Sequence, residues 1–220
     1  MPLDGRYRIS RVITPATSFD LVTLDQAKAA LGIDPTDTSQ DAALQQHITQ
    51  ISAAIARYCD RVFVQQVYRD QFRAVYNWLA AGDPLMTRQN PIAVDDTGLP
   101  LATITENGAI IDATAWDVNP SSGEFYRIDG ALVTQWTGTT ILIDYTAGFD
   151  PIPDDVQAAA LEWLGVQWHS GYGRDPTLRS ETIPDLITQV WDTGGGSTES
   201  KTAMPASVEY LLCSYRIWSL

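Results

Sequence analysis

Few residues of this 220-residue chain have the type and spacing that catalysis or metal binding requires. A catalytic site needs an activated nucleophile with a base in reach, or a metal cage. The chain has two histidines, His47 and His169, and two cysteines, Cys59 and Cys213, with no CxxC or HExxH motif. We expect His47 at the surface, His169 in a structural or interface role at a helix end, and both cysteines as buried free thiols. The prediction is therefore no catalytic residue, no metal site and no cofactor.

The glycine and aspartate clusters also favour structure over chemistry. The run Gly194–Ser197 lacks the lysine and spacing of a phosphate-binding loop, so we interpret it as a flexible linker. The pairs Asp95–Asp96 and Asp154–Asp155 are typical of turns and helix starts. An enzyme acting through carboxylates is the least favoured class.

Charge bears on the partners. The chain has 27 acidic and 14 basic residues, a formal net charge of −13. Broad nucleic-acid binding needs clustered Lys and Arg, so this balance disfavours it, although DNA could pass such a surface without binding. Arg6, Arg8 and Arg11 are an exception that we interpret as a frayed, solvated terminus, with pairing to an acidic partner as the alternative. No apolar run reaches the roughly 18 residues that span a membrane.

Helical periodicity appears on both sides of a β-rich stretch. Thr23 and Gly32 have the types of helix caps, which predicts a short helix over 24–31. A second helix of about 18 residues starts near Asp41 and has an apolar stripe at helical spacing; its residues are Leu44, Ile48, Ile51, Ile55 and Tyr58.

Residues 62–147 instead show short β-prone runs between turn signals. Asn107–Gly108 is the strongest hairpin signal, and Ile141–Tyr145 alternates cleanly. We predict an α+β protein, in which a helical bundle body of about four helices (1–61 and 148–220) is interrupted by a β-rich insert (62–147).

The helix that starts at Pro153 and runs to about Ser170 is apolar on two sides. Two apolar stripes indicate burial on two flanks, one against the body and the other against a second subunit, although a central helix of a monomer fits the periodicity equally well. The predicted interface residues are Val156, Ala160, Trp163, Leu164 and Trp168.

A poorly patterned stretch, 170–203, precedes a terminal helix that starts at Pro205. Long stretches of this kind are usually functional or disordered. The terminal helix has the amphipathic pattern and the aromatic anchors of a docking segment. Its predicted docking residues are Val208, Leu211, Leu212, Tyr215, Arg216 and Trp218.

Three segments together resemble the head–tail connector, or adaptor, proteins of tailed bacteriophages, prophages and gene-transfer particles. They are VTLDQAKAALGID with the following long helix to Arg61, YTAGFDPIPDDVQAAALEWLGVQW, and MPASVEYLLCSYRIW. The resemblance covers roughly 23–61 and 145–220, and it rests on order, spacing and chain length. The β-rich insert is larger than in the smallest family members.

This resemblance implies a structural virion protein without enzymatic activity. It implies a ring, commonly twelve-fold, that docks beneath the portal protein, contacts a stopper or tail-terminator protein, and extends a channel through which DNA passes without specific binding. The C-terminal segment Pro205–Leu220 would reach towards the portal. The protein would be made in the host cytoplasm and reside in the neck of the virion.

One further class stays open at this point. The protein could be another neck or tail-completion protein, or a carbohydrate- or receptor-binding module that acts through the β-rich insert. Trp116, Tyr126 and Trp136 are the candidate sugar-binding aromatics, although aromatics at strand spacing more often belong to a core.

Overall fold

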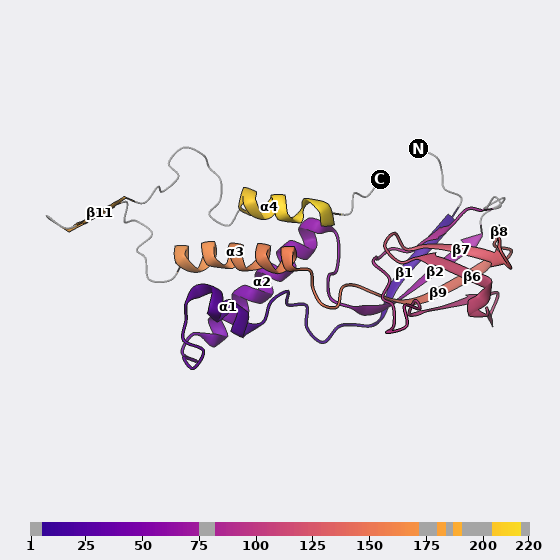
Figure 1. Cartoon of the computed structure of the whole chain (residues 1–220), viewed down its shortest axis with the longest axis horizontal. Helices are drawn as coiled ribbons and strands as arrows, with labels where there is room; N and C mark the ends of the chain where they lie inside the picture. Colours follow the sequence, from indigo (N-terminus) through magenta and orange to yellow (C-terminus); the bar gives the residue numbers. More distant parts are fainter. Residues whose placement is uncertain (1–5, 75–81, 172–179, 184–186, 191–203, 217–220) are drawn as a thin grey trace. The chain divides into compact units, whose positions relative to one another are not determined.

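The computed structural model describes residues 6–74, 82–171, 180–183, 187–190 and 204–216 (Figure 1). These residues form four α-helices and antiparallel strands, which confirms the predicted α+β class. The chain divides into two compact units, and we call them the helical unit (Asp20–Asp60 with Asp154–Leu220) and the β unit (Met1–Phe19 with Arg61–Pro153). Among the described helices, none is long and apolar enough to cross a membrane.

The helical unit begins with the two predicted helices, α1 (Leu24–Leu31) and α2 (Asp41–Cys59). Thr23 caps α1 and forms a reciprocal capping box with Gln26, and Gly32 ends the helix at a φ of 69°. Four residues of the predicted apolar stripe of α2 are buried, namely Leu44, Ile48, Ile51 and Ile55, and Tyr58 is half-buried. The polar residue Ser52 of α2 is also buried. Its hydroxyl accepts a 3.0 Å hydrogen bond from the backbone N–H of Leu21, which fixes the chain that enters α1.

Two later helices complete this unit: α3 (Asp154–Gly171) and α4 (Ala206–Leu212), the latter extended by a short 3₁₀ turn, η2 (Cys213–Tyr215). Helix α3 packs against α1, α2 and α4. A separate hairpin, β10 (Ser180–Ile183) with β11 (Ile187–Val190), lies between α3 and α4 in the sequence.

The β unit has a five-stranded antiparallel sheet in the order β1-β2-β9-β4-β5. Its strands are β1 (Arg6–Thr14), β2 (Gln66–Ala74), β9 (Thr140–Ala147), β4 (Ala102–Glu106) and β5 (Ala109–Ile110). The predicted hairpin joins β4 to β5, with Asn107 and Gly108 at φ of 50° and 88°. Side chains of β9 alternate strictly between buried and half-buried, so the sheet has one packed and one open face.

A second antiparallel sheet contains β3 (Leu85–Met86), β7 (Glu124–Asp129) and β6 (Trp116–Asn119), and β8 (Leu132–Thr134) also pairs with β7. A 3₁₀ turn, η1 (Ala113–Ala115), precedes β6. The core of the unit contains aromatic and branched residues of both sheets, including Phe72, Phe125, Trp136, Ile143 and Tyr145.

The interpretation of the N-terminus as frayed was wrong. Strand β1 pairs with β2 along its whole length, from Arg6 opposite Ala74 to Thr14 opposite Val67. Eight of the nine residues of β1 pair with β2, and this pairing satisfies donors and acceptors that a frayed end would leave to water. Met1–Phe19 consequently belongs to the β unit, whereas the sequence analysis placed it with the helical body.

Candidate assembly surfaces

The five residues predicted for a subunit interface are buried within the single chain. Val156, Ala160 and Leu164 are at most 1% exposed, Trp163 is 5% exposed and Trp168 is 6% exposed. The prediction that one flank of α3 is left for a second copy is corrected here, because α1, α2 and α4 together cover both apolar stripes.

Contacts within the helical unit show how α3 is covered. The ring of His47 on α2 lies 5.9 Å from that of Trp168 in an edge-to-face arrangement, so His47 is a packing residue and not the surface residue that we predicted. Gln26 of α1 donates a 2.7 Å hydrogen bond to Gln157 of α3. The exposed side of α3 carries Val166, which is 48% exposed.

The predicted docking residues of the C-terminal helix divide into two groups. Val208 and Leu212 are fully buried against the rest of the helical unit and are not available to a partner in this structure. Leu211 and Tyr215 are half-buried, and the guanidinium of Arg216 lies over the ring of Tyr58 at 5.2 Å. Trp218 lies outside the described residues. Tyr210, which the sequence analysis passed over, is 79% exposed.

A buried lysine closes the turn between α1 and α2. The ammonium of Lys28 donates hydrogen bonds to the carbonyls of Pro35 (3.3 Å) and Asp37 (2.9 Å) and pairs with Asp41 at 2.6 Å. Its side chain is only 4% exposed. Such burial of an ammonium is tolerated because every donor has an oxygen partner. The sequence signal was weak, since a lysine in the last turn of a helix ordinarily marks only the helix dipole.

The aromatic residues of the insert do not form a sugar-binding surface. Trp116 and Trp136 are 6% and 1% exposed and belong to the core of the β unit. This is the more common place for aromatic residues at strand spacing. Tyr126 is half-buried and donates a long 3.4 Å hydrogen bond to Glu124. No observation on these residues favours the carbohydrate-binding alternative.

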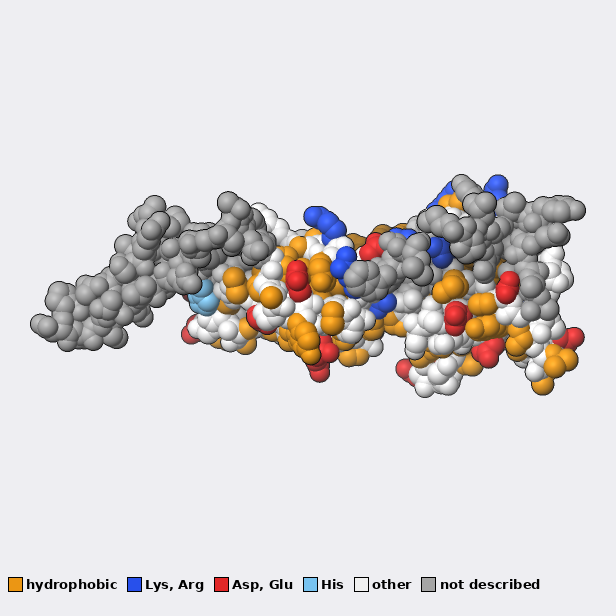
Figure 2. All heavy atoms as spheres, turned by 90° about the horizontal axis from the view of Figure 1, so that it is seen from above, with side chains coloured by type: hydrophobic (Ala, Val, Ile, Leu, Met, Phe, Trp, Pro, Cys, Tyr) orange, Lys and Arg blue, Asp and Glu red, His pale blue; other side chains and the backbone are white. Residues whose placement is uncertain are grey.

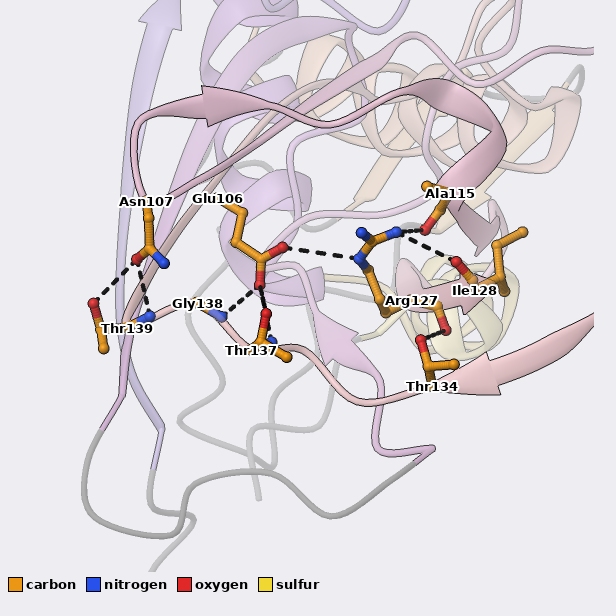
Figure 3. Close-up of polar contacts among 9 residues, drawn as sticks. All are labelled: Glu106, Asn107, Ala115, Arg127, Ile128, Thr134, Thr137, Gly138 and Thr139. Atoms are coloured by element: carbon orange, nitrogen blue, oxygen red, sulfur yellow. Dashed lines mark hydrogen bonds and ion pairs between the residues drawn. The ribbon is translucent and has the colours of Figure 1, made fainter. Parts of the chain in front are cut away.

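Polar contacts pin the loops at one end of the β unit (Figure 3). The carboxylate of Glu106 accepts hydrogen bonds from the backbone of Thr137 (2.9 Å) and Gly138, and it pairs with Arg127 of the second sheet at 3.8 Å. Asn107 accepts bonds from the backbone N–H of Thr139 at 3.0 Å. Because each oxygen serves a nearby donor, these residues fix loop geometry and offer no unpaired group for chemistry.

A buried carboxylate, Asp70 of β2, ties the N-terminal strand to this unit. It accepts hydrogen bonds from the hydroxyl of Ser10, from the backbone N–H of Arg88 (2.7 Å) and from the hydroxyl of Tyr145 (3.1 Å). Burial raises the pKa of Asp70 above its ordinary value, although these bonds and the charge of Arg8 act in the opposite direction. Burial and the adjacent Asp70 charge likewise raise the pKa of Tyr145.

The open face of the five-stranded sheet, which we call the outer sheet face, carries arginines. Register places Arg11 opposite Arg69, and Arg69 opposite Asp144 on the next strand. Arg69 and Asp144 form a bidentate pair with both N–O distances at 2.6 Å. Arg73 lies on the same face, because it is four residues from Arg69 on one strand.

The histidines, cysteines and acidic side chains do not gather into a further site among the described residues. Within the described residues, no three His, Cys, Asp or Glu side chains approach closely enough to hold a metal ion. Cys59 is buried as predicted, but Cys213 is exposed, because it lies in the 3₁₀ turn beyond the buried side of α4. His169 is exposed in the last turn of α3.

Comparison with known families tests the resemblance directly. Residues 21–82 match the family model described as "Phage gp6-like head-tail connector protein". This segment is connector-like. It comprises α1 and α2 of the helical unit and β2 of the β unit, so the connector resemblance inferred from the sequence is confirmed for this part. No curated protein matches the chain.

Solved structures extend the likeness to the whole fold. The chain is similar to a subunit from the neck of an empty GTA particle computed with C6 symmetry, with 19% identity, a TM-score of 0.55, and coverage of 96% of this chain and 97% of that one. A subunit of the virion of a native gene transfer agent (GTA) particle gives 18% identity and a TM-score of 0.53 over the same shares. A subunit from the neck of a native GTA particle computed with C12 symmetry gives 17% and 0.51, again over 96% and 97%. The connector-like chain therefore shares its fold, nearly end to end, with subunits of GTA particles.

Proposed function

We propose that this connector-like chain is a structural subunit of the neck of a phage-like particle. In this proposal it forms a ring, twelve-fold in the virion, that joins the capsid portal to the tail or to a stopper protein and extends the DNA channel. The observation that carries the proposal is the coverage of the fold match: 96% of this chain aligns with 97% of a neck subunit, so the β-rich insert belongs to the matched architecture. The connector-family match over 21–82 supports it independently.

The surface chemistry is compatible with a passive channel component. The formal charge of −13 repels the phosphate backbone, so DNA would pass without being held. The proposed role is non-enzymatic and needs no cofactor. Assembly would take place in the host cytoplasm, and the mature location would be the virion neck.

Portal docking is assigned to the exposed side of the C-terminal segment. Among the described residues of this segment, Tyr210 is the most exposed large one, with Leu211 half-buried beside it. Aromatic residues are favoured anchors at protein interfaces. Removing the whole segment would also remove Val208 and Leu212 from the core, so point substitutions give the cleaner test.

The experiment mixes the full chain with portal particles of its own virus and measures ring formation and portal attachment by electron microscopy. Wild type should form rings on the portal, Tyr210→Ala should weaken attachment, and the matched surface variant Val166→Ala should not. A chain that stays monomeric at all concentrations, both alone and with portals, would refute the proposed function. Normal attachment of Tyr210→Ala would refute only the docking assignment.

A further inference from the structure

The basic residues of this acidic chain are concentrated on two neighbouring strands. Strands β1 and β2 contain five arginines and a single acidic residue, Asp70, which is buried. On the β unit in Figure 2, most Lys and Arg side chains in view lie in the upper half, and most Asp and Glu side chains lie in the lower half. Arg11, Arg69 and Arg73 lie on the outer sheet face, whereas Arg8 lies opposite the buried Phe72 and therefore on the packed face. Asp144 pairs with Arg69, so the outer sheet face keeps a local excess of positive charge on a molecule of formal charge −13.

Two of these arginines have no internal role that explains them. Arg11 and Arg73 are exposed, and within the described residues neither side chain has a hydrogen bond or an ion pair. Arg11 lies directly opposite Arg69, and like charges at such a position destabilise a sheet. Residues that cost the isolated fold stability without a local gain are expected at functional surfaces.

The same face provides a recess beside the charges. A hollow of about 350 Å³ opens next to the Arg69–Asp144 pair and is lined among others by Val67, Leu101 and Thr103. Leu101 is 44% exposed at its rim. Arginine side chains beside a recess with an apolar rim form the mixture that protein interfaces prefer.

The complementary surface is on the helical unit. Residues 20–60 and 154–220 carry 15 acidic and 6 basic residues, a formal charge of −9, whereas 1–19 and 61–153 carry 12 and 8, a charge of −4. The first turns of α1 and α3 present Asp25, Asp154 and Asp155, all exposed, and the hydrogen bond from Gln26 to Gln157 holds these turns together.

We infer that the outer sheet face of one copy, through Arg11, Arg69 and Arg73, binds the acidic helical unit of a second copy of this chain. This inference rests on the proposed ring function and names its subunit contact. Joining different surfaces of identical chains gives a head-to-tail contact, which closes into a ring when the rotation permits. Complementary charges set the orientation and speed of such encounters, and they suppress wrong pairings.

The test measures ring formation of the full chain by sedimentation velocity and native mass spectrometry as a function of protein and salt concentration. The double variant Arg11→Glu/Arg73→Glu should need about tenfold more protein, or higher, to form rings. Arg57→Glu, a charge reversal at an exposed arginine of α2, is the matched control and should assemble normally. Raising the salt concentration should weaken wild-type rings, because exposed charges are screened.

A charge swap identifies the partner surface. Adding Asp154→Lys/Asp155→Lys to the double variant should restore assembly, and circular dichroism should show that every variant is folded. The acidic side chain introduced at position 11 would face Arg69, so folding stability should hold or rise while assembly falls.

The outcomes separate the inference from the function on which it rests. Wild-type rings that are unaffected by Arg11→Glu/Arg73→Glu would overturn the inference and leave the proposed function standing. If Arg11→Glu/Arg73→Glu leaves the rings intact but abolishes binding of duplex DNA in a separate binding assay, the inference is overturned in favour of a polyanion-binding surface. A wild-type chain that never oligomerises would remove the proposed function itself.

Discussion

The two units differ in how much of their secondary structure they leave exposed to partners. In the helical unit the apolar stripes of α2, α3 and α4 meet one another, so that even the double stripe of α3 is buried inside one chain. In the β unit the main sheet buries one face, and the other carries arginines, threonines and an ion pair in the open. Two apolar sides on a helix therefore indicate that it lies at the centre of a bundle. A surface that is free to bind partners is more readily found on the half-exposed sheet.

The largest change in stability should come from a substitution that disrupts the packing of α3 in the core of the helical unit. Trp163→Ala should lower the free energy of unfolding by about 3–5 kcal/mol, because a buried indole leaves a cavity that its neighbours fill only in part. Urea unfolding followed by the helical circular dichroism signal measures the loss. Val166→Ala on the exposed side of the same helix is the control, with an expected change within about 0.5 kcal/mol. A loss below about 1 kcal/mol for Trp163→Ala would mean that this side chain is available to a neighbour, as first predicted.

A second way to sharpen the comparison is to remove the buried charge of the helical unit. Lys28→Met keeps the aliphatic stem but removes the ammonium that serves the carbonyls of Pro35 and Asp37. We expect a loss of about 2–3 kcal/mol in urea unfolding, because buried acceptors lose their donor. Asp41→Asn should cost less, since the side chain of Asp41 is 28% exposed and water can replace its partner. Equal losses would show that the ion pair, and not the carbonyl contacts, holds the turn.

The helical unit was predictable from sequence in its elements but not in its surfaces. Caps at Thr23 and Gly32 and the regular stripe of α2 fixed the helix boundaries, since both signals are local. Periodicity cannot state what covers an apolar stripe, so Trp163 and Leu212 were assigned to partners although α3 and α4 cover each other. Tyr210 was missed because it lies off that stripe.

The β unit shows the opposite balance. Its hairpin at Asn107–Gly108 and the alternation of β9 could be predicted, because turn chemistry and period two are local. The pairing of β1 with β2 could not, since it joins residues about 60 apart and depends on the burial of Asp70 beneath Ser10. The outer sheet face depends on that pairing, because only the register brings Arg11 beside Arg69.

A third prediction concerns the buried carboxylate of the β unit. Asp70→Asn should destabilise the β unit by about 1–3 kcal/mol, because both oxygens of a carboxyl group can accept hydrogen bonds, also in the protonated form, whereas the amide nitrogen cannot and would face a donor. Its raised pKa means that the folded state holds the proton more tightly than the unfolded chain. The Asp70 contribution to stability is therefore fully present below the ordinary value of 3.8 and declines as pH rises through the raised folded pKa.

The measurement compares urea unfolding of wild type and Asp70→Asn at several pH values. The advantage of wild type should shrink as pH increases from below 3.8 towards neutrality. Asp129→Asn, at an exposed position of β7, is the control for a general effect of charge. An advantage that grows with pH would mean that the hydrogen bonds to Asp70 outweigh its burial and that its pKa is lowered.

The smallest effect tests whether local signals alone stabilise the connector-like segment. Thr23→Ala removes the side-chain cap of α1, whose hydroxyl accepts a 3.2 Å hydrogen bond from Gln26 N–H while the Gln26 side chain binds back at 2.8 Å. Loss of such a cap typically costs about 1 kcal/mol. Thr38→Ala, at an exposed threonine of the α1–α2 turn, should change urea unfolding by less than about 0.5 kcal/mol. If both substitutions have the same effect, the packing of α1 on α2 and α3, and not its capping box, determines where the helix begins. The predicted start of α1 would then agree with the structure because of tertiary contacts more than because of the cap.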